Sequence, residues 1–157
     1  MPNTTIRRKD RALSREEAVQ ILRDGEYGIL STIGEDGYPY GVPISYAYTE
    51  DGKIWLHGAK EGHKVNNIAY CPKASFTVVG ATHVLQDKFS TLYSSAIAFG
   101  TIQLCAGLEK QKGIMTIVAK YSPDFIEEGE AFAQKTMQAM NVYYLTMEGL
   151  TGKAKKE

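Results

Sequence analysis

The chain has 157 residues, of which 43% are hydrophobic and 23% charged, and its 18 basic residues balance its 18 acidic ones. This composition is typical of one globular domain, excludes an intrinsically disordered chain and argues against nucleic acid as the main partner. No apolar run approaches the roughly 18 residues of a membrane-spanning helix and no signal peptide opens the chain, so we expect a cytoplasmic protein.

The first predicted helix covers about Ser14–Asp24. Ser14 and Glu17 form a capping-box pattern, apolar residues follow at helical spacing, and Gly25 is a natural end. The polar residues before it, 1–13, are expected to be a flexible tail. We expect one domain over residues 14–150 and a second, basic tail over residues 151–157.

Three strands joined by tight turns follow this helix. They are predicted at Tyr27–Ile33, Tyr38–Tyr48 and Lys53–His57, and Asp36-Gly37 is a strong hairpin signal between the first two. Pro39 and Pro43 interrupt the second strand. Since proline cannot donate a ladder hydrogen bond, they indicate an edge, a bulge or a face left open.

The second half of the chain alternates helices and strands. Helical patterns cover Lys64–Tyr70, Leu108–Tyr121 and Glu127–Met140; strand patterns cover Ala74–Gly80 with His83–Gln86, Leu92–Ala106 and Asn141–Glu148. The pattern therefore predicts six antiparallel strands with interspersed helices and no βαβ repeat. That combination favours an α+β fold with a closed or split barrel.

The stretch from His57 to Lys64 combines two histidines, two glycines and two lysines at a strand-to-helix turn. A helix start attracts an anion through its free N–H groups and its dipole, and Lys64 adds a full charge, so a phosphate is the expected ligand. From these residues alone, a plain connection explains the turn equally well. His57 and His63 lack a third ligand, so we predict no metal site, and Cys71 and Cys105 are expected to be buried thiols.

Standard catalytic motifs are absent from the chain. It has no nucleophile elbow, phosphate-binding P-loop, zinc-protease motif or dinucleotide fingerprint. Ser94 and Ser95 have no base that the sequence reveals. Catalytic side chains therefore stay unassigned.

Several short motifs resemble the FMN-binding split-barrel family that contains the pyridoxamine 5′-phosphate oxidases. They are residues 37–40 at the first hairpin, Lys53–His57 followed by Gly62-His63-Lys64, and Asn67-Ile68 before Cys71-Pro72. Within the family the chain is most similar to the nitroimidazole-resistance (Nim-type) and general flavin-nucleotide-binding branch, on His57-Gly58-Ala59 and on residues 93–96 ahead of Phe99-Gly100. The resemblance spans about residues 14–150.

This resemblance implies a six-stranded antiparallel split β-barrel and a homodimer with two FMN sites at the subunit interface. Lys64, His63 and the amides near Gly62 would hold the phosphate, and His57 with Gly58 would lie along the ring edge and ribityl chain. The implied cofactor site consists of Val42, Pro43, Ile44, Ser45, His57, Gly58, Ala59, Gly62, His63, Lys64, Ser94 and Ser95. Of these, residues 42–45 would line the isoalloxazine ring.

Two departures separate the chain from true pyridoxamine phosphate oxidases. Val42 and Ala47 stand where those enzymes carry basic residues. Those enzymes also end in a tryptophan- and arginine-rich substrate segment, whereas the only tryptophan here is Trp55, so the clamp for a vitamin B6 substrate is missing. We therefore expect an FMN-dependent oxidoreductase that reduces a small electron-poor compound such as a nitroimidazole, with protons from solvent, Tyr40 or His57. The alternative is a non-enzymatic flavin or haem carrier or sensor, with His57, His63 or His83 as an axial ligand.

Overall fold

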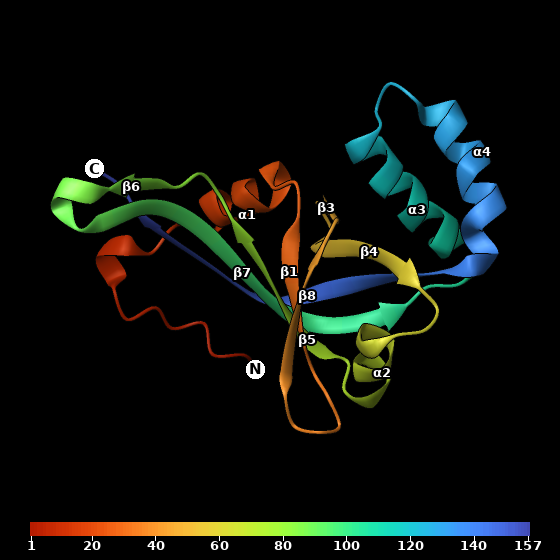
Figure 1. Ribbon diagram of the computed structural model, residues 1–157, viewed down its shortest axis with the longest axis horizontal. Helices are drawn as coiled ribbons and strands as arrows, with labels where there is room; N and C mark the ends of the chain where they lie inside the picture. The colour runs from red at the N-terminus through yellow and green to blue at the C-terminus, as the bar shows by residue number, and fades with distance from the viewer.

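The computed structural model describes residues 1–157, and its strands form one twisted antiparallel sheet flanked by four helices (Figure 1). The strands are β1 (Gly28–Ile33), β2 (Pro39–Ile44), β3 (Ala47–Thr49), β4 (Lys53–Ala59), β5 (Lys73–Val79), β6 (His83–Leu85), β7 (Ser90–Leu104) and β8 (Met140–Lys155). The helices are α1 (Arg15–Asp24), α2 (His63–Tyr70), α3 (Gly107–Tyr121) and α4 (Ile126–Thr136). None of them is long and apolar enough to cross a membrane.

The sheet runs in the order β2-β1-β5-β7-β8-β4-β3, and β6 adds to β7. Its two edge strands, β2 and β3, are consecutive in sequence, so the chain crosses from one edge to the other without closing the ladder. This confirms the α+β split-barrel prediction, although the sheet has eight strands where six were predicted. The predicted second strand divides at Ser45-Tyr46 because the Tyr46 N–H donates to the Tyr121 hydroxyl of α3, at 3.0 Å, and not to a strand.

The edge position of β2 accounts for its two prolines. β2 pairs only with β1, where Pro39 lies opposite Ile33 and Pro43 lies opposite Ile29. An edge strand has unpaired backbone groups along its outer side, so a missing N–H on that side costs little. Of the three explanations that the sequence allowed, the edge is the one that the topology supports.

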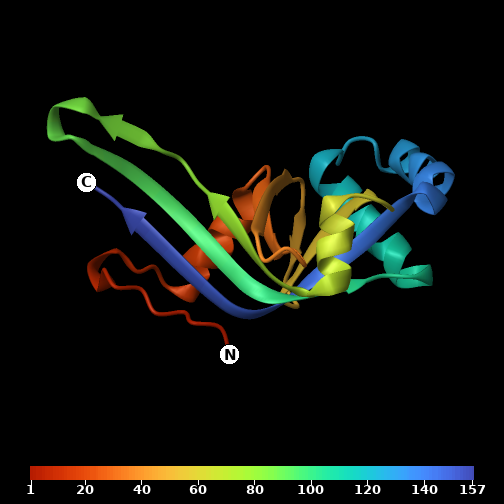
Figure 2. The ribbon, with the colours of Figure 1, turned by 60° about the horizontal axis from the view of Figure 1, so that its bottom comes forward.

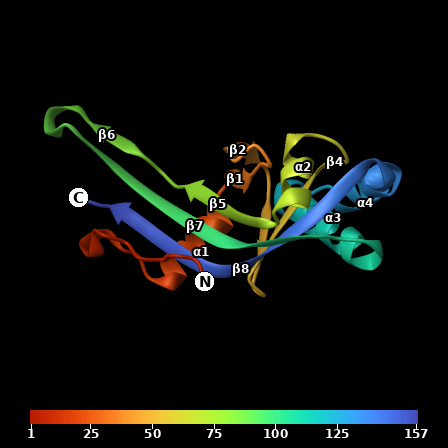
Figure 3. The same ribbon diagram turned by 90° about the horizontal axis from the view of Figure 1, so that it is seen from below.

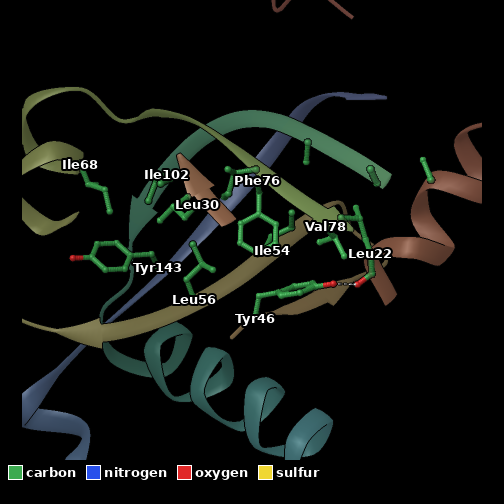
Figure 4. Packing of buried hydrophobic residues seen from close by; sticks show 14 residues of the cluster. Leu22, Leu30, Tyr46, Ile54, Leu56, Ile68, Phe76, Val78, Ile102 and Tyr143 are labelled. Carbon is green, nitrogen blue, oxygen red and sulfur yellow. Dashed lines mark hydrogen bonds between the residues drawn. The ribbon is translucent and has the colours of Figure 1, made fainter. Parts of the chain in front are cut away.

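Two apolar clusters hold the fold together. The larger fills the barrel with residues from α1, α2 and most strands, among them Leu30, Ile54, Phe76 and Tyr143 (Figure 4). Tyr46 reaches across this core and its hydroxyl donates to the Leu22 carbonyl of α1. The smaller cluster, around Trp55, Ile114 and Val142, lies between the sheet and α3. Each face of β4 is therefore buried.

The last strand is longer than the sequence predicted. The closing strand was expected at Asn141–Glu148 and a basic tail from residue 151, but β8 continues to Lys155 and pairs with β7 as far as Tyr93. Small residues permit this, because Gly152 and Ala154 are buried and a side chain on Gly152 would collide with Ala18 of α1. Residues 151–155 are therefore part of the sheet. The N-terminal residues 1–13 contain only a 3-10 helix, Lys9–Arg11, and a bridge from Ala12 to Lys153.

The long pair of β7 and β8 carries a projecting arm. β6 and the first half of β7 form a hairpin that, with the end of β8, extends away from the barrel on the side opposite α3 and α4 (Figures 2 and 3). A register shift between Phe99 and Gly100 marks the bend where the arm leaves the body. Gly100 is required there, since a side chain would meet the Thr146 carbonyl oxygen.

Candidate functional site

The connection from β4 to α2 brings together the residues that the sequence singled out. β4 ends at Ala59, and α2 begins at His63 after Gly62, which has φ +137°. This left-handed region favours glycine. Gly62 offers no side chain to cap the helix, so the first N–H groups of α2 stay available to a ligand.

Lys64 folds back over the end of β4. A β-carbon built on Gly58 would fall 2.5 Å from Lys64 Nζ and 3.2 Å from its Cε, so the missing side chain of Gly58 provides the space for the lysine. The four ion pairs of the structure all involve other residues. Burial lowers the pKa of Lys64. A half-buried ammonium group without a counter-ion is predisposed to bind an anion.

His57, the residue before Gly58 on β4, lies close enough to Lys64 to be affected by its charge and has an unused polar atom. Its Nδ1 is buried and has no hydrogen-bond partner, and it is the one such side-chain atom in the protein. Burial lowers the pKa of His57, and the nearby charge of Lys64 lowers it further. The imidazole is therefore neutral at neutral pH and can donate to or accept from a ligand.

Two contacts fix α2 against the barrel. The rings of Tyr40 in β2 and His63 stack with centroids 3.8 Å apart and planes 23° apart. Asn67 Nδ2 donates to Thr32 Oγ1 of β1 at 3.0 Å, and these two are the only polar residues among those fully buried. Asn67 lies one helical turn after Lys64, so its bond sets the rotation of the helix that presents the lysine.

One positive charge near this site, that of Lys110, was not predicted from the sequence. Lys60 lies in the turn itself, and the pKa of Lys110 is lowered by burial and by the charge of Lys60, which places α3 beside the turn. The proximity of Lys110 depends on how α3 packs, and no local motif signals it. Nowhere do three His, Cys, Asp or Glu side chains gather closely enough to hold a metal ion.

The predicted ring-binding residues divide between two faces of β2. Val42 and Ile44 are half-buried and pack on the barrel core, whereas Pro43 and Ser45 are exposed. Tyr40, two residues before Val42, already touches α2. The beginning of β2 therefore borders the site, and residues 42–45 continue from it along the edge.

Within one chain, Ser94 and Ser95 lie far from the predicted cofactor-binding residues at the α2 turn. They pair with Ala154 and Lys153 on β8, whereas Gly58 pairs with Asn141 of the same strand. At about 3.3 Å per residue, this separation along β8 is about 40 Å. The two serines thus belong to the arm, and a single chain does not bring them to Lys64.

A surface cavity of about 380 Å³ is lined by residues of β1, β2, β5, β7 and β8. Ser31, Ile33, Pro39, Ser75 and Phe99 line it, along with the first two residues of the chain. Lys73 is the only basic side chain among its lining residues. It has no helix N-terminus and no unpaired buried polar atom, so the α2 turn fits an anion better.

Comparison with known proteins identifies the family. Residues 14–154 match the family model described as pyridoxamine 5′-phosphate oxidase. No curated protein sequence matches the chain. Similar solved structures include a proposed 5-nitroimidazole antibiotic resistance protein from Bacteroides thetaiotaomicron, with 18% identity and a TM-score of 0.74 over 92% of this chain and 90% of that one.

Two larger proteins share the fold. The FAD and haem binding protein from Mycobacterium smegmatis has 21% identity and a TM-score of 0.80 over 92% of this chain and 72% of that one. The flavocytochrome Anf3 from Azotobacter vinelandii has 17% identity and a TM-score of 0.82 over 98% and 74%. At such identities these structures establish the fold, and the family model adds the sequence pattern. The chain therefore belongs to the pyridoxamine 5′-phosphate oxidase family.

Proposed function

We propose that the protein binds FMN as a homodimer and reduces a small electron-poor organic compound, with nitro compounds as the substrate class. The observation that carries this is the half-buried ammonium group of Lys64, which lies over Gly58 without an acidic partner at the start of α2. A terminal phosphate supplies the missing negative charge. Membership of a family whose members bind flavin, by the resemblance stated above, gives that phosphate an identity.

The residues present fit the phosphate end of FMN. Lys64 would form a charge-assisted hydrogen bond to it, the free N–H groups of α2 would donate to its oxygens, and Lys60 and Lys110 would add attraction at longer range. The stack of Tyr40 on His63 holds the first turn of α2 in place. The FMN ring would extend from there along β2.

When bound, FMN supplies the hydride chemistry, so no side chain needs to act as a nucleophile. The chain binds and orients the cofactor and manages protons. Burial and the charge of Lys64 favour the neutral form of His57, and its buried Nδ1 has no partner within the chain, so His57 is the first proton donor or acceptor that we propose. Tyr40 is half-buried beside α2 and is the other proton donor that we propose.

Vitamin B6 phosphates are poor candidates for the substrate. Val42 packs on the core and Ala47 is buried, so neither position offers a cation for a second phosphate. The fold shared with the proposed nitroimidazole resistance protein supports a nitro compound instead. A cytoplasmic location is consistent with this role and is part of the proposal.

A flavin or haem carrier is the second candidate function. Its support is the unpartnered Nδ1 of His57, which could ligate iron, together with the fold shared with an FAD and haem binding protein. His83 is exposed on β6 of the arm and His63 is stacked on Tyr40, so His57 is the best axial ligand.

The visible absorption spectrum of the purified protein, before and after addition of FMN or haem, tests both candidates. Flavin absorption bands and a measurable FMN affinity support the first, and a Soret band that disappears in His57→Ala supports the second. Protein that takes up neither group refutes both. Oxidation of NADH or NADPH in the presence of a nitroaromatic then decides whether FMN-loaded protein turns over.

A further inference from the structure

The tip of the arm displays an aromatic side chain that the chain itself leaves uncovered. Phe89 is 97% exposed and has a left-handed backbone, with φ 48° and ψ 48°. It is the only non-glycine residue with positive φ. Val84 on β6 is 63% exposed. A bulky residue in that conformation costs free energy, and such residues concentrate at sites of function.

The opposite end of the molecule has a matching apolar surface. On α4 and the residue before it, Phe125 and Phe132 are 61% and 64% exposed. They are seven residues apart, two turns of helix, with Glu128 between them, so the three side chains share one face. Nothing else in the chain covers this face.

The two surfaces carry opposite charge. Residues 124–136, which contain α4, have four acidic side chains and one basic one. The arm end, comprising residues 87–88 and 153–157 with the adjoining 7–11, has eight basic side chains and three acidic ones. Such complementarity favours contact between the arm of one chain and the α4 end of another.

The strand register places the pair Ser94 and Ser95 and the site residue Gly58 at similar distances from the bend, on opposite sides of it. Gly100 lies opposite Met147 on β8. Asn141, opposite Gly58, is six residues from Met147 in one direction, and Ser94 and Ser95 are six and five residues from Gly100 in the other. A two-fold axis beside Gly100 would thus bring each serine pair to the level of the other chain's Gly58, about 20 Å from the axis.

The same rotation carries Phe89 further. It lies 11 residues from Gly100, whereas Met140, where β8 begins after α4 and the 3-10 helix Met137–Ala139, lies seven residues from Met147. The tip therefore reaches about four residues past the start of the other chain's β8, at the end of the molecule where α4 lies (Figure 3).

We propose that two copies of the chain pair around this axis, with the Phe89 tip of each arm docked on the Phe125–Phe132 face of the other copy's α4. The proposal rests on the homodimer in the proposed function and specifies its contact. It also explains how Ser94 and Ser95 join the Lys64 site, since the second copy supplies them.

Photo-crosslinking from position 89 tests the contact. With benzoylphenylalanine in place of Phe89, irradiation should produce a covalent dimer whose crosslink maps to the tryptic peptide of residues 121–135. The same probe at Tyr38, which is 73% exposed at another hairpin, is the control and should not label that peptide. Crosslinks from position 89 to other peptides, or a chain that stays monomeric, would overturn the docking.

Charge reversal gives a second readout. Lys88→Glu and Glu128→Lys should each raise the dimer dissociation constant about tenfold in sedimentation equilibrium, and the double variant should recover most of the loss. Additive losses in the double variant would contradict the proposal. Neither measurement needs flavin, so a crosslinked dimer that binds no FMN refutes only the proposed function, and an FMN-binding protein with other crosslinks refutes only the docking.

Discussion

The ammonium group of Lys64 occupies the space that a side chain at Gly58 would fill, 2.5 Å from the position of its β-carbon. This relationship joins the last residues of β4 to the first turn of α2. A side chain at position 58 would displace the lysine, so the site requires Gly58 as well as Lys64.

Gly58→Ala is therefore expected to displace Lys64 and leave the fold intact, because the obstructing atoms are the far end of a flexible side chain. FMN affinity should fall about tenfold, equivalent to about 1.4 kcal/mol, while the melting temperature changes little. Isothermal titration calorimetry and thermal unfolding measure the two effects. Unchanged FMN affinity in Gly58→Ala would show that Lys64 does not contact the phosphate.

The histidine beside this pair should titrate below its ordinary range. Burial and the charge of Lys64 both lower the pKa of His57. NMR titration of its ring protons should give a pKa under 6.5, the ordinary value, and Lys64→Gln should raise it by removing the second cause. A His57 pKa that does not respond to Lys64→Gln would place the two side chains too far apart to interact.

The same pKa difference has a consequence for stability. Between 6.5 and the lower pKa of the folded protein, the unfolded chain binds a proton at His57 that the folded chain does not. The free energy of unfolding should therefore decrease as pH falls from 6.5 through the folded-state pKa, and His57→Phe should flatten this part of the profile. Denaturant unfolding at several pH values measures it.

The buried bond between Asn67 and Thr32 should determine how α2 presents Lys64. Asn67→Leu leaves the Thr32 hydroxyl buried without a partner and should cost about 1–3 kcal/mol of unfolding free energy. Thr32→Val should cost a similar amount, and the double variant less than the sum, because no unpaired group remains. FMN affinity should fall in the double variant even where stability recovers. Strict additivity in unfolding experiments would argue that the two side chains act independently.

Much of the fold could be predicted from local sequence. The capping box of Ser14 and Glu17 is formed as expected, with both of its hydrogen bonds. The hairpin turn at Asp36-Gly37 is also present, with Gly37 at φ +82°. These features depend on residues three or four apart, which a sequence displays directly.

The errors arose where distant parts of the chain decide the structure. The predicted strand 38–48 divides at Tyr46 because α3 accepts its backbone hydrogen bond, and β8 extends to Lys155 because α1 packs on Gly152. Lys110 joins the site only through the packing of α3. Ser94 and Ser95 were assigned to the site by resemblance, and their place on the arm makes that assignment depend on a second copy.

The most direct test of a phosphate at Lys64 compares FMN with riboflavin, which lacks the phosphate, on wild-type protein and on Lys64→Gln. Charge-assisted hydrogen bonds to a phosphate should make wild-type protein bind FMN about 10- to 100-fold more tightly than riboflavin. In Lys64→Gln most of this preference should disappear, with riboflavin affinity nearly unchanged. The control Arg15→Gln, which neutralises an exposed residue of α1, should behave as wild type. A preference for FMN that survives in Lys64→Gln would place the phosphate elsewhere and contradict the account.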